Sequence, residues 1–256
     1  MLYRQRAVLC ALSLGSSRSA AWVQPSHRLS SRKILRQQSS LFVHQNNLLP
    51  VSSLQNEYYA LRHGQSMANV AKIIASNPEI ACTNYGLSPI GKDQAIRAGQ
   101  DVVQRYQEQT YQGVLILASD LLRAKETAET VAEAVQKASI PLHNNGVVIE
   151  TRLRERGFGE WDGGSDEHYN DVWKDDAIDP THTIQGVESV LSVMDRSSTC
   201  VLEWDAIVQN HFVICVAHGD VLQMLQTSFS KMDGSKHRTL DHLETATLRP
   251  LLLTPN

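Results

Sequence analysis

Residues 58–70 read YYALRHGQSMANV, an apolar run that ends abruptly in Arg-His-Gly. Tyr58 to Leu61 have the aromatic and apolar character of a buried strand. Arg62 and His63 are costly to bury unless other groups pair with them, so they belong at the end of that strand. The stretch therefore predicts a chemical site at the carboxyl edge of a sheet.

The residues after His63 are suited to a turn and a helix start. Gly64 permits a tight turn or a close approach of backbone to a ligand. Ser66 is a good N-cap for a helix that begins at Met67, and Asn69 would place an amide donor one turn into that helix. A second strand-like run, VICVA, also ends in His-Gly, at His218 and Gly219. Two strands that end in the same dipeptide indicate one shared site.

The chain divides into two parts by charge. All 27 acidic side chains follow residue 56, whereas seven of the 24 basic ones precede it, so residues 57–256 carry a net charge of about −10. That balance argues against nucleic-acid binding. The length of 256 residues, with 42% hydrophobic and 20% charged residues, fits one globular domain with an extension. We expect a leader and disordered linker over residues 1–56 and a catalytic domain over residues 57–256.

The leader has the composition of an organellar targeting peptide, because it lacks acidic residues and is rich in Arg and Ser. Ala7 to Leu14 form a short apolar run, and SAAWVQP, residues 19–25, resembles the signal-to-transit junction of diatom-type plastid proteins. We expect a plastid location, with the mitochondrion as the alternative. The apolar run is too short to span a bilayer, so no membrane association of the mature form is expected.

Short apolar runs alternate with longer helical stretches after residue 56. This alternation predicts an α/β three-layer sandwich with a mainly parallel central sheet and helices on both faces. The expected strands are Tyr58–Leu61, Val114–Ala118, Val147–Ile149, Phe212–Ala217 and, as a last one, Glu244–Leu248. The expected helices are Gly91–Tyr106, Leu121–Lys137 and Gly186–Ile207, and residues 157–182 are expected to be an irregular excursion over one edge of the sheet.

Several common sites are not indicated. GLSPIGKD, residues 86–93, approaches a phosphate-binding loop, but Asp93 stands where a hydroxyl is needed and Pro89 removes an amide donor. Ser88 and Pro89 instead predict a helix start. Cys82, Cys200 and Cys215 lack metal or disulfide spacing and are expected to be core thiols. We expect no metal and no cofactor.

The charged residues at the strand ends suit phosphoryl transfer through nitrogen. Neutral His63 can attack phosphorus in line, and Arg62 and Arg123 offer planar forks that match phosphate. Protonated His218 would add a further donor. Glu155, kept protonated by burial and by nearby phosphate charge, could protonate the leaving group and then deprotonate the attacking water. A surface salt bridge of Glu155 to Arg152 or Arg156 is the competing interpretation.

The chain resembles the histidine phosphatase superfamily, also called the phosphoglycerate mutase-like family. The resemblance rests on five segments in the family's order: RHGQSMAN at 62–69, LSPIGKDQA at 87–95, SDLLRAKETA at 119–128, LRERGFGEWDG at 153–163, and the strand that ends in His218-Gly219. It implies that His63 is the phosphorylated nucleophile, Glu155 the proton donor, and His218 with both arginines the phosphate pocket. The predicted catalytic residues are His63, Glu155 and His218, and the predicted substrate-binding residues are Arg62, Gly64, Gln65, Ser66, Asn69, Arg123 and Gly219.

The preferred function is a phosphomonoesterase that acts on a small phosphorylated metabolite. Residues 157–179 are acidic with Lys174 as their only lysine, which resembles the short phosphatase form of the family. Phosphoglycerate mutase is the alternative, and a phosphoprotein phosphatase or an inactive scaffold ranks below it. The expected partner is the substrate, and a homodimer is left open. His168, His182, His237 and His242 are expected to be solvated, with His168 or His182 as candidates for the mouth of the site.

Overall fold

The computed structural model describes residues 49–251. A five-stranded sheet in the order β3-β2-β4-β1-β5 forms its centre. Strands β1 (Glu57–Arg62), β2 (Gly113–Ala118), β3 (Val148–Ile149) and β4 (His211–Ala217) are parallel, and β5 (Leu248–Pro250) runs antiparallel to β1. The predicted strands are present, except that the last one begins at Leu248, because residues 244–247 form a turn with Ala246 at a φ of 54°.

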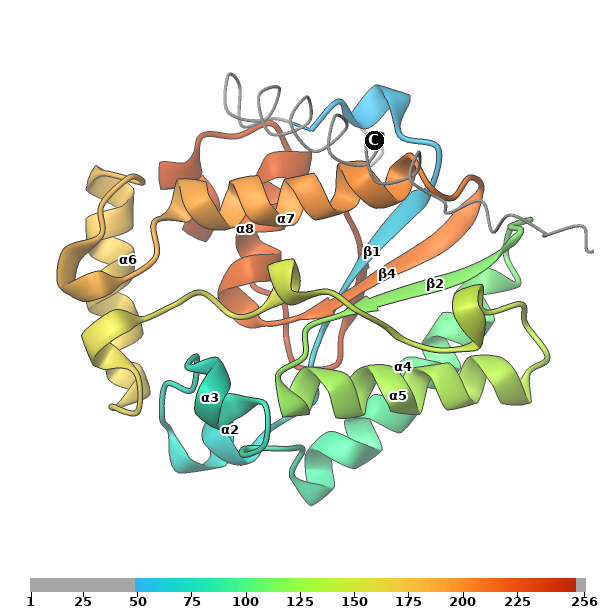
Figure 1. Ribbon diagram of the computed structural model, residues 1–256, viewed down its shortest axis with the longest axis horizontal. Coiled ribbons are helices and arrows are strands. Elements are labelled where there is room, and N and C mark those ends of the chain that lie inside the picture. Colours follow the sequence, from blue (N-terminus) through green and yellow to red (C-terminus); the bar gives the residue numbers. More distant parts are fainter. Residues whose placement is uncertain (1–48, 252–256) are drawn as a thin grey trace, which may run out of the picture.

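Helices cover both faces of this sheet, as predicted (Figure 1). Helices α4 (Pro89–Tyr106) and α5 (Leu122–Lys137) lie on one face, and α7 (Val190–Asp205) and α8 (Gly219–Phe229) lie on the other. Successive residues of each central strand alternate between the two cores: Tyr58 and Ala60 pack under α7 and α8, whereas Tyr59 and Leu61 pack under α4 and α5. Strand β2 is buried along its whole length, which is typical of a parallel sheet covered on both faces.

Residue-level rules explain where these helices begin. Ser88 caps α4 by accepting from the Gly91 amide at 3.0 Å, with Pro89 in the first turn, as the sequence indicated. Ser189 caps α7 in the same way, so this helix begins at Val190 and not at Gly186. Helix α8 was not predicted; nearly all of its residues are buried, including polar ones such as Gln223 and Gln226.

Three shorter helices lie beyond one end of the sheet: α2 (Met67–Ala71), α3 (Pro78–Ala81) and α6 (Tyr169–Ile178) (Figure 1). Helix α6 corrects the prediction that residues 157–182 are irregular. Its hydrophobic pattern is weak because its buried positions include the charged Asp176 together with Val172. Among residues 49–251, no helix combines the length and apolar content needed to cross a bilayer.

The packed domain begins before residue 57. Leu49 is fully buried in the core under α7 and α8, and the Asn56 side chain donates to Asp205 Oδ1 and to the Val208 carbonyl oxygen, both at 2.8 Å. Residues 49–56, which the sequence analysis placed in the leader, therefore pack on the catalytic domain. The rest of the predicted leader lies outside the described residues.

Candidate active site

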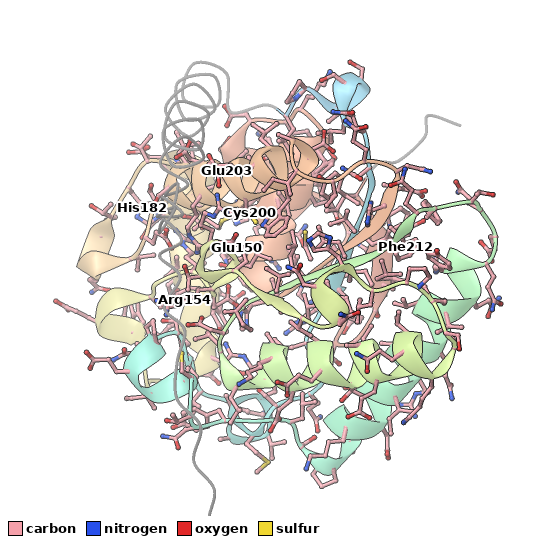
Figure 2. The ribbon with its side chains drawn as sticks, turned by 45° about the vertical axis from the view of Figure 1, so that its right-hand side comes forward. Glu150, Arg154, His182, Cys200, Glu203 and Phe212 are labelled. Carbon is pink, nitrogen blue, oxygen red and sulfur yellow. The ribbon has the colours of Figure 1, made fainter. Side chains whose placement is uncertain are left out.

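The two His-Gly turns lie side by side at the carboxyl edge of the sheet. Strands β1 and β4 are adjacent and parallel, with Arg62 opposite Ala217, so His63 and His218 leave the sheet at the same level. The His63 amide donates to the Ala217 carbonyl oxygen at 3.0 Å, and the two imidazole centroids are 5.1 Å apart. In Figure 2, Phe212 near the start of β4 and His182, which follows α6, lie on opposite sides of the view.

The contacts of His63 define which ring nitrogen can attack. Nδ1 lies 2.7 Å from the Gly64 carbonyl oxygen, which can only accept, so Nδ1 carries the proton. Nε2 accepts from Arg123 Nε at 3.1 Å and therefore holds the lone pair. Burial and then the charges of Arg123 and Arg62 hold the pKa of His63 well below 6.5. His63 is thus a neutral imidazole with its lone pair directed toward a guanidinium.

Both arginines are fixed by other contacts and keep one N–H group free. Arg123, in the first turn of α5 as predicted, donates from Nη2 to the Ala75 carbonyl oxygen at 2.9 Å, and its buried Nη1 has no acceptor among the described residues. Arg62 donates from Nη1 to His242 Nε2 at 2.8 Å and to the Leu243 carbonyl oxygen at 3.1 Å, while its buried Nε lacks an acceptor there. Buried donors without acceptors suit an anionic ligand.

His218 is oriented by Ser119, the residue that follows β2. The Nε2 atom lies 2.9 Å from Ser119 Oγ, and the buried Nδ1 has no partner among the described residues. Burial and the charges of Arg123 and His63 lower the pKa of His218 well below 6.5. This lowering differs from the expectation of a protonated His218 and favours a neutral ring.

Glu155 has the environment of a carboxylic acid that stays protonated near neutral pH. It lies partly buried, and burial together with the negative charge of Asp220 raises its pKa to about 7. Its Oε1 accepts from the Arg156 backbone amide at 2.9 Å. The competing salt bridges are wrong, because Arg152 pairs with Glu150 and Glu203 and Arg156 pairs with Asp176.

The other predicted binding residues build the turn after β1. A Cβ on Gly64 would stand 2.5 Å from the Gly91 carbonyl oxygen, so this glycine is required for packing against α4. Ser66 and Asn69 form a capping box at the start of α2. Gln65 Oε1 accepts from Ser88 Oγ at 2.8 Å. These contacts are structural, and binding of substrate by Gln65, Ser66 and Asn69 stays a prediction.

The sequence analysis gave no role to Thr127 or Ser119, although both side chains hold residues of the site in place. Thr127 Oγ1 accepts from the Gly64 amide at 3.1 Å and donates to the Arg123 carbonyl oxygen at 2.7 Å. Ser119 positions His218. Two sequence signals could have revealed these roles. Thr127 lies four residues after Arg123, on the same face of a predicted helix, and Ser119 comes directly after a predicted buried strand.

The segment after Glu155 is anchored by a buried ionic network that the sequence did not predict. Asp176 of α6 accepts from both terminal nitrogens of Arg156 at 2.7 Å, and both side chains are fully buried. His182 Nε2 lies 2.8 Å and His237 Nε2 3.5 Å from Asp176. His182 and His237 are therefore buried, which corrects the expectation that they are solvated, whereas His242 is exposed, as expected, and contacts Arg62.

Aromatic side chains of α6 face this side of the site. Tyr169 stacks on Trp173 with ring centroids 5.5 Å apart and meets Phe158 edge to face. Burial and the charges of Glu155 and Asp220 raise the pKa of Tyr169, which shows that its hydroxyl lies near the predicted acid. Trp161 stacks on His168, 4.0 Å between centroids, farther along the same segment.

Proteins of similar sequence include a phosphatase and a probable mutase. The chain is 31% identical over 179 residues to glucosyl-3-phosphoglycerate phosphatase of Mycolicibacterium vanbaalenii, over 64% of this chain and 70% of the relative. It is 27% identical over 192 residues to a probable phosphoglycerate mutase, GpmB, of Erwinia tasmaniensis, over 72% of this chain and 79% of the relative.

Solved structures give the same result. A mycobacterial glucosyl-3-phosphoglycerate phosphatase in complex with VO3 superimposes with a TM-score of 0.60 at 27% identity, covering 75% of this chain and 90% of that one. The sequence profile of the histidine phosphatase superfamily, branch 1, matches residues 58–256. The chain therefore belongs to the histidine phosphatase superfamily, branch 1.

Proposed function

We propose that this protein is a phosphomonoesterase that acts through phosphorylation of His63. The observation that carries the proposal is the Nε2 lone pair of a neutral, oriented His63 beside the guanidinium of Arg123. Arg62, Arg123 and His218 each retain a buried N–H or ring nitrogen without a partner in the described part of the chain. Three such groups around one nucleophile fit the equatorial oxygens of a transferring phosphoryl group.

The mechanism has two balanced steps. In the first, His63 Nε2 forms a bond to phosphorus while the ester P–O bond breaks, and Glu155 donates its proton to the departing alkoxide. In the second, the Glu155 carboxylate takes a proton from water, whose oxygen attacks phosphorus as the P–N bond breaks. Phosphate leaves, and Glu155 is protonated again. The negative charge of a bound phosphoryl group raises the pKa of His218, so its ring can then act as a charged donor.

The substrate class follows from the relatives. The relatives include phosphatases of glucosyl-3-phosphoglycerate, which supports a small phosphorylated sugar or sugar-acid as the substrate of this chain. The GpmB relative supports phosphoglycerate mutase as the second candidate. Hydrolysis ranks first because residues 157–179 carry a single lysine. A mutase needs further positive charges to hold its phosphoester while that ester reorients in the closed site.

The test is phosphoenzyme trapping followed by product analysis. Full-length protein mixed briefly with a phosphorus-labelled ester should carry acid-labile, base-stable label, and should release phosphate with excess chelator present, because Arg62, Arg123 and His218 supply the positive charge themselves. Loss of activity that magnesium or zinc restores would overturn this mechanism. Interconversion of 2- and 3-phosphoglycerate that is faster than hydrolysis would place the mutase first.

We also propose that residues 1–48 direct the protein to an organelle, with the plastid preferred over the mitochondrion. The acid-free, Arg- and Ser-rich composition supports this proposal. A fluorescent protein fused to these residues should enter the organelle, and diffuse cytosolic fluorescence would contradict the proposal. The partner that we propose is the small phosphorylated substrate, and we propose no nucleic-acid or membrane partner.

A further inference from the structure

His242 contacts Arg62, one of the two arginines that we assign to the phosphoryl group. The His242 Nε2 atom lies 2.8 Å from Arg62 Nη1, which can only donate, so Nε2 is the acceptor and the ring proton lies on Nδ1. The Leu243 carbonyl oxygen accepts from the same Nη1 at 3.1 Å. The buried Arg62 Nε, which has no acceptor within residues 49–251, is a different nitrogen of this guanidinium. His242 therefore holds Arg62 at a nitrogen other than the one offered to the anion.

The backbone on both sides of His242 is fixed by β5 and by the core. Arg249 of β5 donates to the Asp241 carbonyl oxygen at 2.7 Å and to the His242 carbonyl oxygen at 2.9 Å. Leu243, the next residue, is buried in the core under α7 and α8. The imidazole of His242 thus meets Arg62 from a segment that is already held in place.

The imidazole of His242 is exposed and can exchange its proton with solvent. Besides the guanidinium of β5, the charged groups around it are Arg62, Arg238 of the 3-10 helix after α8, Asp220 of α8, and Glu244. Partial burial and then the charges of Arg62 and Arg238 lower the pKa of His242 from 6.5, against the opposite effects of the two carboxylates. The ring is therefore neutral near pH 7 and becomes charged in acid.

Protonation of His242 removes its hydrogen bond to Arg62. An imidazolium carries an N–H on both ring nitrogens, so Nε2 and Arg62 Nη1 would meet as two donors. Two positive groups whose nitrogens are 2.8 Å apart also repel each other. The Leu243 carbonyl oxygen then remains as the acceptor for Nη1. The guanidinium of Arg62 loses one of the two contacts that fix this nitrogen.

We propose that His242 is a positioning residue that holds Arg62 in place for the phosphoryl group while its imidazole is neutral and releases Arg62 in acid. This inference rests on the proposed role of Arg62 in the phosphatase and adds a pH-dependent control of anion affinity. The alternative is that a charged His242 attracts the anion directly. The geometry favours positioning, because Nε2, the atom that takes the new proton, faces a guanidinium N–H.

The experiment measures the affinity of the full-length protein for inorganic sulfate by titration calorimetry from pH 5 to 8. Sulfate is the probe because its charge is constant in this range, whereas that of phosphate changes. His242→Gln keeps an acceptor that cannot titrate, and His242→Ala removes the acceptor. At pH 8 we expect His242→Gln within about 2-fold of the parent and His242→Ala roughly 3- to 10-fold weaker, less than a full charged hydrogen bond because water reaches this exposed position. At pH 5 the parent should weaken, relative to His242→Gln, to the level of His242→Ala.

Double variants separate positioning from direct attraction. In an Arg62→Gln background, His242→Ala should cause no further loss, because no guanidinium is left to hold. His211→Gln replaces a histidine at the opposite end of β4 from the site and should change neither the affinity nor its pH dependence. Rescue by His242→Gln at pH 8, together with the loss of pH dependence, distinguishes a hold on Arg62 from a merely structural role.

Three results would overturn the role of His242. They are parallel pH curves for the parent and His242→Gln, tighter sulfate binding by the parent than by His242→Gln in acid, and an equal loss on His242→Ala with and without Arg62. Unchanged sulfate affinity in Arg62→Gln would overturn the phosphate pocket together with this inference. Absence of a phosphoenzyme, with the expected sulfate results intact, would count against the phosphatase alone.

Discussion

His63 and His218 follow neighbouring strands in register, yet their ring nitrogens have different partners. His63 Nδ1 is tied to a carbonyl oxygen and Nε2 faces Arg123, whereas His218 Nε2 faces the Ser119 hydroxyl. A nitrogen whose lone pair points at a guanidinium is placed to attack the phosphoryl group that the guanidinium binds. The environment of each ring, and not its strand position, therefore supports the proposed roles of His63 as nucleophile and His218 as donor.

Substitution of each histidine tests that assignment. His63→Ala should abolish turnover and phosphoenzyme labelling, since no neighbour supplies a replacement nucleophile. His218→Ala should lower kcat roughly 10²- to 10³-fold, as loss of one preorganised donor does, and leave some labelling. Rapid-quench labelling with phosphorus-labelled ester measures both. If His63→Ala still accumulates phosphoenzyme and His218→Ala does not, the roles are reversed.

The pH dependence of activity should report Glu155. Its pKa of about 7 means that it is protonated below that pH, so kcat/KM for an alkyl phosphate should fall as pH rises above about 7. The lowered pKa of His63 keeps the nucleophile neutral on the acid side of 6.5. Glu155→Gln should remove the alkaline fall and slow phosphorylation by alkyl esters far more than by p-nitrophenyl phosphate, whose leaving group needs no proton.

A matched variant checks the cause of that pKa. Asp220→Asn removes the neighbouring negative charge, so the pKa of Glu155 should drop and the alkaline fall should begin at lower pH. Steady-state rates across pH 5 to 9 for both variants decide the matter. An unchanged alkaline limb in Glu155→Gln would show that another group controls it.

At the scale of elements, the loop after β1 and helix α4 are in backbone contact. A Cβ on Gly91 would stand 2.0 Å from the Gln65 carbonyl oxygen, so Gly91→Ala must displace the turn that carries His63. We expect a loss of about 1–3 kcal/mol in the free energy of unfolding, despite the better helix propensity of alanine. Displacement of the nucleophile by an ångström should cost kcat about 10²-fold.

Gly146→Ala is the control for that variant. No atom lies within 4 Å of a Cβ at Gly146, and its φ of −178° is ordinary extended backbone. Urea unfolding and p-nitrophenyl phosphate hydrolysis are measured for both proteins. Equal behaviour of the two alanine variants would show that the close approach of α4 does not position His63.

At the scale of the whole molecule, residues 49–56 pack against the end of α7 and the start of β4. Leu49 is fully buried, and Asn56 and the Gln55 amide together supply three hydrogen bonds to the Asp205 carboxylate. A chain that begins at Glu57 should therefore be less stable than one that begins at Leu49 by about 3 kcal/mol, because it lacks one buried leucine and leaves the Asp205 carboxylate with the Tyr58 hydroxyl as its remaining donor. Urea midpoints of the two truncated proteins test this, and equal midpoints would contradict it.

The sequence by itself determined the layers and the catalytic edge. Apolar runs of strand length separated by helical periods define a parallel α/β sandwich, and two runs ending in His-Gly must meet at one edge because parallel strands end together. Capping residues such as Ser66 and Ser88 also act within a few residues, so their helix starts could be predicted. These features depend on sequence patterns among residues a few positions apart, so they can be predicted without knowledge of distant contacts.

Only the tertiary structure decided the features that depend on distant pairs. From the sequence, Asp176 resembles a surface residue of an acidic stretch. In the structure Arg156, His182 and His237 surround it. These contacts bury two histidines around helix α6, in the segment that was expected to be irregular. Asp220 and Glu155 are 65 positions apart in the sequence, yet their proximity raises the pKa of Glu155. The position of Arg238 over Trp173 likewise follows from the return of the chain after α8. Charge interactions depend on distance in space, which the order of residues alone does not contain.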